Sequence, residues 1–177
     1  MEQAHGVLVD VLGVGVLLVG PSGIGKSECA LELVRRGHRL IADDVVRLER
    51  RGEALFGASP EIIRHTLEIR GIGILYVPDL YGAGAVADEA RIDLLCRLEE
   101  WNERSEFERV GLERQREVWD GVELPRLTLP ARPGAHMATL IEAGARDHEL
   151  RKAGLETGAA RVDARMRGER EKEPGRS

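Results

Sequence analysis

The sequence contains few cysteines: Cys29 and Cys96 are the only two among 177 residues. Two cysteines cannot form the disulfide framework that stabilises many small secreted domains. The first residues, Met1–His5, also lack the basic segment with which a secretory signal peptide opens. We therefore expect a cytoplasmic protein, and we interpret both cysteines as packing residues inside the fold.

Long apolar runs and an excess of positive charge are absent as well. No apolar run approaches the roughly 20 residues that a membrane-spanning helix needs, so no membrane segment is expected. The 26 basic and 31 acidic side chains give a net charge of −5, which argues against nonspecific binding to nucleic acid or to an anionic membrane. With 42% apolar and 32% charged residues, the chain has the composition of one folded soluble domain.

Lysine is also scarce, since only Lys26, Lys152 and Lys172 occur among the 26 basic residues. Lys26 lies in a segment that matches the P-loop pattern G-x-x-x-x-G-K-[ST]. The segment consists of Gly20, Pro21, Ser22, Gly23, Ile24, Gly25, Lys26 and Ser27. Its glycines leave backbone N–H groups open to phosphate oxygens, Lys26 would reach the β- and γ-phosphates, and the Ser27 hydroxyl would bind Mg²⁺. The segment thus predicts a site for nucleotide phosphates.

The residues around this loop predict a βαβ unit. Apolar runs rich in valine and leucine predict strands over Val7–Val11 and Val14–Val19, as in a sheet covered on both faces. Helical spacing predicts a helix over Ser27–Arg36, and a short strand follows over Arg39–Ala42. Because a strand, a helix and a strand follow one another, we expect part of the sheet to be parallel.

The rest of the chain predicts further strands and C-terminal helices. The expected elements are a hairpin over Val45–Phe56, strands over Gly71–Val77, Ile92–Leu98 and Val122–Leu129, and a helix over Met137–Lys152. Pro125 would place its strand at a sheet edge or at a bulge. The expected fold class is α/β, a P-loop core with a mixed parallel and antiparallel sheet and C-terminal helices. We expect one domain over residues 1–155, and over residues 156–177 a helix that frays into a charged, disordered tail.

Three carboxylates are candidates for chemistry beside the phosphates. Asp43 and Asp44 end the strand after the P-loop helix, and ligands of parallel sheets bind at the carboxyl ends of strands. Glu68 precedes another predicted strand. One acid could hold Mg²⁺ and another could take a proton from an incoming hydroxyl. The Asp43-Asp44 pair also fits an ordinary turn at the end of a strand, so these residues alone leave the role open.

Five segments of the chain together resemble one enzyme family. In order, they are His5-Gly6-Val7-Leu8-Val9-Asp10, the P-loop, Gly37-His38-Arg39-Leu40-Ile41-Ala42-Asp43-Asp44, Leu67-Glu68-Ile69-Arg70-Gly71-Ile72-Gly73-Ile74, and Arg132-Pro133-Gly134. The sequence resembles the catalytic domain of the HPr kinase/phosphorylase family over most of residues 5–155. The segment from Leu67 to Ile74 is a signature of that family and is much more specific than the P-loop.

The resemblance implies a kinase that transfers the γ-phosphoryl group of ATP to a serine of HPr, a small phosphocarrier of the sugar phosphotransferase system. Many members also catalyse the reverse reaction, in which inorganic phosphate removes that group and pyrophosphate is released. ATP or pyrophosphate, together with Mg²⁺, would be the cofactors. The family further implies a homohexamer, with the C-terminal helices near the subunit contacts and HPr.

The resemblance also implies roles for individual residues. Asp43 would be the general base that activates the serine hydroxyl, and in the reverse reaction it would act as an acid towards the same oxygen. His5 would lie beside Asp43 and orient it, and Asp44 would support the site. Ser27 and Glu68 would hold Mg²⁺.

Two arginines, Arg70 and Arg132, would face phosphate or HPr, but the sequence after Arg132 departs from the family. The family loop commonly reads Arg-Pro-Gly-Arg-Asn, whereas here Ala135 and His136 take the last two places. Ala135 removes an arginine that could stabilise charge on the transferring group, and His136 cannot make a bidentate contact. This favours the kinase direction over phosphorolysis. Family proteins usually carry a large N-terminal domain as well, so the chain resembles either a short form or a fragment.

Two other functions fit the P-loop alone. One is a kinase of small molecules or a simple NTPase, which would move the phosphoryl group to a metabolite or to water. The other is a binding module that senses a nucleotide and switches a partner without turnover. Transfer of label from ATP to a serine of HPr separates the expected kinase from both.

Overall fold

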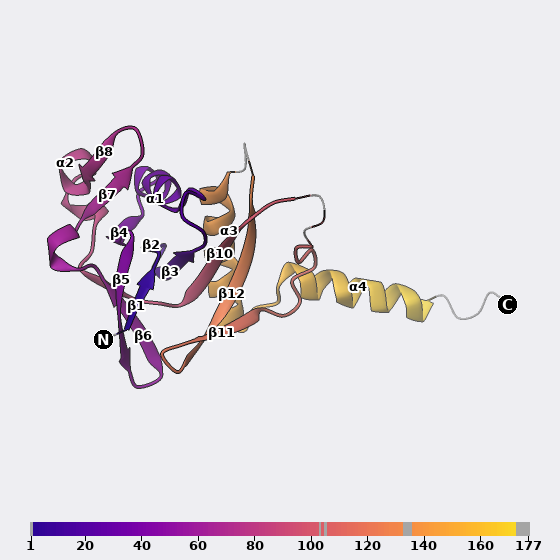
Figure 1. The fold of residues 1–177 in the computed structure, drawn as a ribbon. Helices are drawn as coiled ribbons and strands as arrows, with labels where there is room; N and C mark the ends of the chain where they lie inside the picture. The colour runs from indigo at the N-terminus through magenta and orange to yellow at the C-terminus, as the bar shows by residue number, and fades with distance from the viewer. Residues whose placement is uncertain (1, 103, 105, 133–135, 173–177) are drawn as a thin grey trace.

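The centre of the fold is a mixed six-stranded sheet (Figure 1). The computed structural model describes residues 2–102, 104, 106–132 and 136–172. The strand order is β11-β12-β10-β3-β2-β4, with bounds Gln115–Trp119, Val122–Ala131, Leu94–Glu100, Val14–Val19, Val7–Val11 and Arg39–Ala42. β10 is parallel to β3 and to β12, and the other neighbouring strands are antiparallel. The expected α/β fold with a mixed sheet and C-terminal helices is confirmed.

The βαβ unit predicted around the P-loop is present, but its two strands are not neighbours. β3 leads through the loop into α1 (Lys26–Arg35), and the chain returns in β4. β2 lies between β3 and β4 and is antiparallel to both, so β3 and β4 run in the same direction without pairing. The parallel neighbour of β3 is β10, which follows more than 70 residues later.

A second, antiparallel sheet packs on one face of the central sheet. Its order is β1-β5-β6-β9, with bounds Glu2–His5, Val45–Arg51, Ala54–Ala58 and Glu89–Arg91. The β5–β6 hairpin confirms the prediction made for this region, whereas β1 was not expected. A further hairpin pairs β7 (Thr66–Ile69) with β8 (Gly73–Tyr76). The short helices near it are η1 (Glu61–Ile63), α2 (Val77–Tyr81) and η2 (Ala83–Ala85).

Alternation along β3 divides the core between the two faces of the central sheet. Leu18 packs with Leu33 of α1 and with Ile141 of α3 (Met137–Lys152). Its neighbour Leu17 packs with Leu48 of the second sheet. All five of these leucine and isoleucine side chains are buried. This two-sided burial explains why Val14–Val19 is apolar throughout.

The prediction for Pro125 is wrong for the strand as a whole. β12 lies between β11 and β10 and is therefore not an edge strand. Pro125 pairs only with Arg116 of β11, because the pairing of β12 with β10 begins one residue later, at Arg126. A proline is tolerated there because it has a paired neighbour on one side only.

The C-terminal part contains the expected helix α3 and a last helix, α4 (Gly158–Lys172), which projects away from the two sheets (Figure 1). The division of the chain at residue 155 stays a prediction, and residues 173–177 of the expected tail lie outside the described residues. Within the described ranges, no helix is both long enough and apolar enough to cross a bilayer.

Candidate active site

The P-loop connects the end of β3 to the start of α1, as its sequence predicts. Gly25 immediately precedes α1 with φ 101°, a left-handed conformation that glycine adopts without a steric penalty. A Cβ at Gly20 would lie 2.5 Å from the carbonyl oxygen of Leu98, so β10 leaves room only for glycine there. The loop therefore brings backbone N–H groups and the N-terminal end of α1 to one place.

Lys26 is buried at the first position of α1, with 8% of its surface exposed. Its Nζ donates hydrogen bonds to the carbonyl oxygens of Gly20 at 2.8 Å and of Pro21 at 2.9 Å. Burial lowers the pKa of Lys26, and the nearby carboxylates of Asp43 and Asp44 oppose that effect. The ammonium group is thus held over the loop whose phosphate ligand it is expected to contact.

Asp43 follows β4 and is one of the few buried charged residues, with 5% of its surface exposed. Its Oδ1 accepts a hydrogen bond from Ser27 Oγ at 2.8 Å, and its Oδ2 accepts one from the backbone N–H of Glu68 at 3.0 Å. Burial raises the pKa of Asp43, although both hydrogen bonds act against the rise. The P-loop helix, β4 and β7 therefore meet at this one carboxylate.

The role expected for His5 beside Asp43 stays a prediction: both residues line one cavity, and the His5 ring forms its ion pair with Asp44. His5 Nδ1 lies 3.2 Å from Asp44 Oδ1, and both side chains are 61% exposed. Two features set this geometry: β1 pairs with β5 so that His5 lies opposite Val45, and Asp44 has a left-handed backbone with φ 66°. The His5–Asp44 pair lies at the exposed side of the site, and Asp43 lies at the buried side.

A cavity of about 170 Å³ joins most of the predicted residues. The P-loop contributes Ser22, Gly23, Gly25, Lys26 and Ser27, and the other predicted residues along it are His5, Asp43, Asp44, Glu68 and Arg70. Glu68 and Arg70 are exposed and come from β7 and the turn after it. Residues distant in the sequence therefore converge on the P-loop.

Arg132 lies apart from that cavity. It lines a second cavity of about 660 Å³, on which Gly23, Ile24 and Gly25 of the P-loop also border. Its guanidinium carbon lies 5.8 Å from the ring centre of Trp101, which is a cation–π arrangement. Pro133, Gly134 and Ala135 lie outside the described residues, so the departure at Ala135 stays a sequence-based interpretation.

Trp101 was not among the site residues predicted from the sequence. This residue directly follows β10, at the same carboxyl edge of the sheet as the P-loop. The rule that ligands bind at the carboxyl ends of parallel strands could have indicated it. It was missed because β10 was not known from the sequence to be the neighbour of β3.

The oxygen donors of this site fit a magnesium ion. Ser27 Oγ and Asp43 Oδ1 lie 2.8 Å apart, and Glu68 lines the same cavity. Mg²⁺ in kinases usually takes one or two protein carboxylates or hydroxyls, and phosphate and water oxygens complete its shell. Among the described residues, no group of three or more His, Cys, Asp and Glu side chains forms a metal cage of its own.

The chain matches the HPr Serine kinase C-terminal domain family over residues 1–166. The chain belongs to this family. Among curated relatives, the HPr kinase/phosphorylase of Caldanaerobacter subterraneus subsp. tengcongensis is 55% identical over 151 residues, which are 85% of this chain and 50% of the relative. The HPr kinase/phosphorylase of Geobacillus thermodenitrificans is 49% identical over 172 residues, or 94% of this chain and 56% of the relative.

The fold is also similar to that of a solved structure. The structure of the Hpr(Ser) kinase/phosphatase from Coxiella burnetii is similar, with a TM-score of 0.80 and 33% sequence identity. The match covers 87% of this chain and 94% of that one. The chain spans about half the length of the two curated relatives above.

Proposed function

We propose that this chain is an ATP-dependent protein kinase that phosphorylates a serine of HPr. The observation that carries the proposal is the buried carboxylate of Asp43, which accepts a hydrogen bond from Ser27 of the P-loop. This contact holds a potential base beside the loop that would hold the γ-phosphoryl group. The family match and the HPr kinase/phosphorylase names of the relatives support the same substrate.

In the proposed reaction, Asp43 takes the proton of the acceptor serine. The serine oxygen attacks the γ-phosphorus, the bond from that phosphorus to the β–γ bridging oxygen breaks, and the hydroxyl proton moves to an Asp43 oxygen. A carboxylate has about four acceptor positions, and the hydrogen bonds from Ser27 Oγ and the Glu68 N–H leave Asp43 capacity for this proton. Its raised pKa makes it a stronger base than an exposed aspartate.

The P-loop backbone, Lys26 and Arg70 would hold the phosphates. Lys26 Nζ would exchange its contacts to the Gly20 and Pro21 carbonyl oxygens for phosphate oxygens. Mg²⁺, held by Ser27 and Glu68 and supported by Asp44, would neutralise phosphate charge when bound. The larger cavity beside Gly25, lined by Trp101 and Arg132, has room for the nucleoside of ATP.

His5, Asp44 and the exposed part of the site would face the protein acceptor. We propose HPr as the partner, a homohexamer as the assembly and the cytoplasm as the location, as the resemblance implies. Phosphorolysis of the phosphoserine to pyrophosphate remains part of the proposal, with the kinase direction favoured.

The test is incubation of the purified chain with Mg²⁺, γ-labelled ATP and purified HPr. We expect label on a serine of HPr, detected by mass spectrometry. Lys26→Ala should weaken both nucleotide binding and transfer, and Lys172→Ala, at the end of α4, is the matched control. Label found only in inorganic phosphate or in a small molecule would overturn the assignment of HPr.

A further inference from the structure

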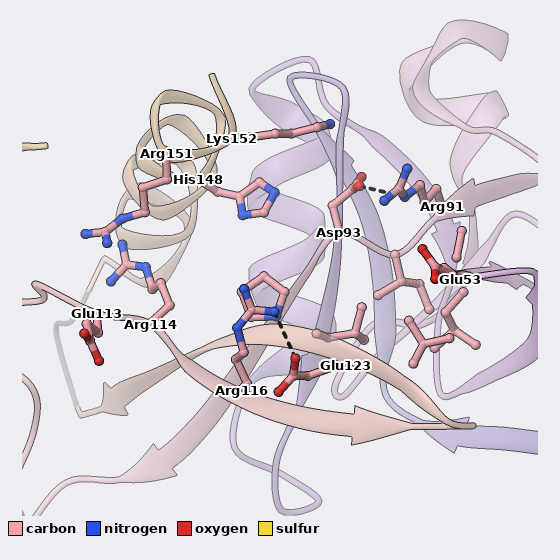
Figure 2. A pocket seen from close by; sticks show the side chains of 16 residues that line it. Glu53, Arg91, Asp93, Glu113, Arg114, Arg116, Glu123, His148, Arg151 and Lys152 are labelled. Carbon is pink, nitrogen blue, oxygen red and sulfur yellow. Dashed lines mark hydrogen bonds and ion pairs between the residues drawn. The ribbon is translucent and has the colours of Figure 1, made fainter. Parts of the chain in front are cut away.

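A separate cavity of about 580 Å³ lies at the end of the central sheet opposite the P-loop (Figure 2). It is lined by residues 91–93, which lead into β10. Asp93 forms hydrogen bonds with Gly15 near the start of β3. The N–H of Asp93 donates to the Gly15 carbonyl at 2.8 Å, and the Gly15 N–H donates to Asp93 Oδ2 at 3.2 Å. The six residues of β3 separate this place from the P-loop by roughly 20 Å. We call it the distal cavity.

One side of the distal cavity is cationic. Arg151 and Lys152 come from the end of α3, and Arg114 comes from the segment before β11 (Figure 2). His148 of α3 lies beside them, and burial lowers its pKa, so its ring is an uncharged donor at neutral pH. Arg151 Nε donates to Asp147 Oδ2 at 2.6 Å, and Arg114 Nη2 donates to the same oxygen. Two guanidinium groups thus share one carboxylate oxygen.

The positive charge on this side is only partly compensated. The nearest carboxylate to Lys152 Nζ is Glu149, at 3.8 Å. Arg114 Nε is inaccessible and has no hydrogen-bond partner among the described residues. Burial lowers the pKa of Arg114, and the neighbouring Arg151 lowers it further. The C-terminal end of a helix attracts cations and accounts for Arg151 and Lys152, but Arg114 belongs to another segment.

The other walls carry two ion pairs. Arg91 pairs with Asp93 at 3.1 Å and Arg116 with Glu123 at 3.3 Å, so both carboxylates already have a cation of their own (Figure 2). Glu53 lies at the opposite end of the cavity from α3 (Figure 2).

Glu113 also lines the distal cavity and lies next to Arg114 (Figure 2). The floor is apolar and consists of the buried side chains Leu55, Ile92, Val122 and Leu124. The distal cavity therefore combines an apolar floor with one cationic wall.

We propose that the distal cavity binds a small organic anion, with its phosphate or carboxylate group on the wall of Arg114, His148 and Lys152 and its body over Leu55 and Leu124. The volume lies within the roughly 300–1,000 Å³ of small-molecule sites. An anion there would accept hydrogen bonds from Arg114 and Lys152 and would leave the Arg91–Asp93 and Arg116–Glu123 pairs in place. The proposal does not depend on phosphoryl transfer at the P-loop.

Hydrogen–deuterium exchange of the 177-residue chain locates such binding. Glycerol 3-phosphate and malate, titrated separately into the millimolar range, serve as the phosphate and carboxylate probes. We expect slower exchange in peptides that cover residues 111–117 and 146–154. Protection by both probes shows that either group is accepted, and protection by one names the group. Protection confined to residues 20–27, or none with either probe, would overturn the proposal.

Variants test the wall directly. Arg114→Gln should weaken the binding of the active probe, measured by calorimetry, roughly tenfold or more, because it removes a charged donor. Lys152→Gln, at an exposed position that no buried contact requires, should weaken it less. The matched control is Arg109→Gln, an exposed arginine of the same segment that does not line the distal cavity. Equal affinity of wild type and Lys152→Gln, with Arg114→Gln folded and also unchanged, would contradict the proposal.

Discussion

Charged side chains have different environments at the two ends of the central sheet. At the P-loop end, Lys26 and Asp43 are buried, and burial moves the pKa of each away from its ordinary value. At the distal end, Arg91, Asp93, Arg116 and Glu123 form ion pairs at the rim of the distal cavity.

This difference separates positions that serve chemistry from positions that serve binding. Buried charges are costly and are retained where a reaction needs them in a fixed place. Exposed ion pairs contribute little to stability and are easily replaced. We therefore expect substitutions at the P-loop end to change turnover most, and substitutions of the distal charges to change the binding of small anions.

The largest effect should follow Asp43→Asn. Loss of the proposed base should reduce phosphoserine formation on HPr by about 10²–10⁴-fold, while nucleotide binding, measured by calorimetry, persists. The control at the distal end of the fold is Asp120→Asn, an exposed aspartate in the turn between β11 and β12. If Asp43→Asn retained full transfer, the contrast between the two ends would fail.

At the distal end, the largest expected effect is a loss of stability caused by substitution of Gly15. A Cβ there would lie 1.7 Å from the carbonyl oxygen of Arg91, so Gly15→Ala must push β3 and the strand entry at residues 91–93 apart. We expect a loss of about 1–3 kcal/mol or more, seen as a lower Tm by calorimetry. Gly84→Ala has no atom within 4 Å of the new Cβ and is the control. An unchanged Tm for Gly15→Ala would show that this contact relaxes freely.

The pH dependence of both rate and stability should reflect Asp43. Because its pKa is raised above 3.8 by burial, the acidic limb of kcat/KM should have its midpoint above pH 3.8. The folded state keeps this proton more tightly than the unfolded state, so the contribution of Asp43 to stability falls as pH rises through that window. Asp43→Asn should therefore raise Tm at neutral pH by roughly a few degrees. A lower Tm for Asp43→Asn would contradict this sign.

The smallest effect should follow His5→Ala. The His5–Asp44 pair is exposed on both sides, and exposed ion pairs contribute about 0.2–1 kcal/mol. We expect transfer to HPr to fall only about two- to fivefold, with Arg64→Ala, an exposed residue outside the site, as the control. A loss as large as that of Asp43→Asn would mean that His5 acts on the reacting atoms and not on the orientation of Asp44.

Local features of the site could be predicted from the sequence, and pairings could not. The P-loop and the start of α1 follow from glycines, Lys26 and helical spacing within a few residues. The partner of His5 depends on the pairing of β1 with β5, and β1 gave no strand signal of its own. The position of Pro125 likewise depends on where β10 begins to pair with β12.

Features assembled from distant segments were also missed. Trp101 became a site residue only once β10 was placed beside β3. The distal cavity combines five segments between residues 53 and 152, and no local pattern connects them. The sequence predicted that β3 and β4 run in the same direction. It did not predict that β2 lies between them.

The most direct test of the account is a crystal structure of the chain with Mg²⁺ and a non-hydrolysable ATP analogue. The account predicts that the γ-phosphate lies on the P-loop with an Asp43 oxygen facing it, and that Ser27 Oγ has turned from Asp43 towards the metal. A γ-phosphate remote from Asp43 would contradict it, with the two Asp43 oxygens still bound by Ser27 Oγ and the Glu68 N–H.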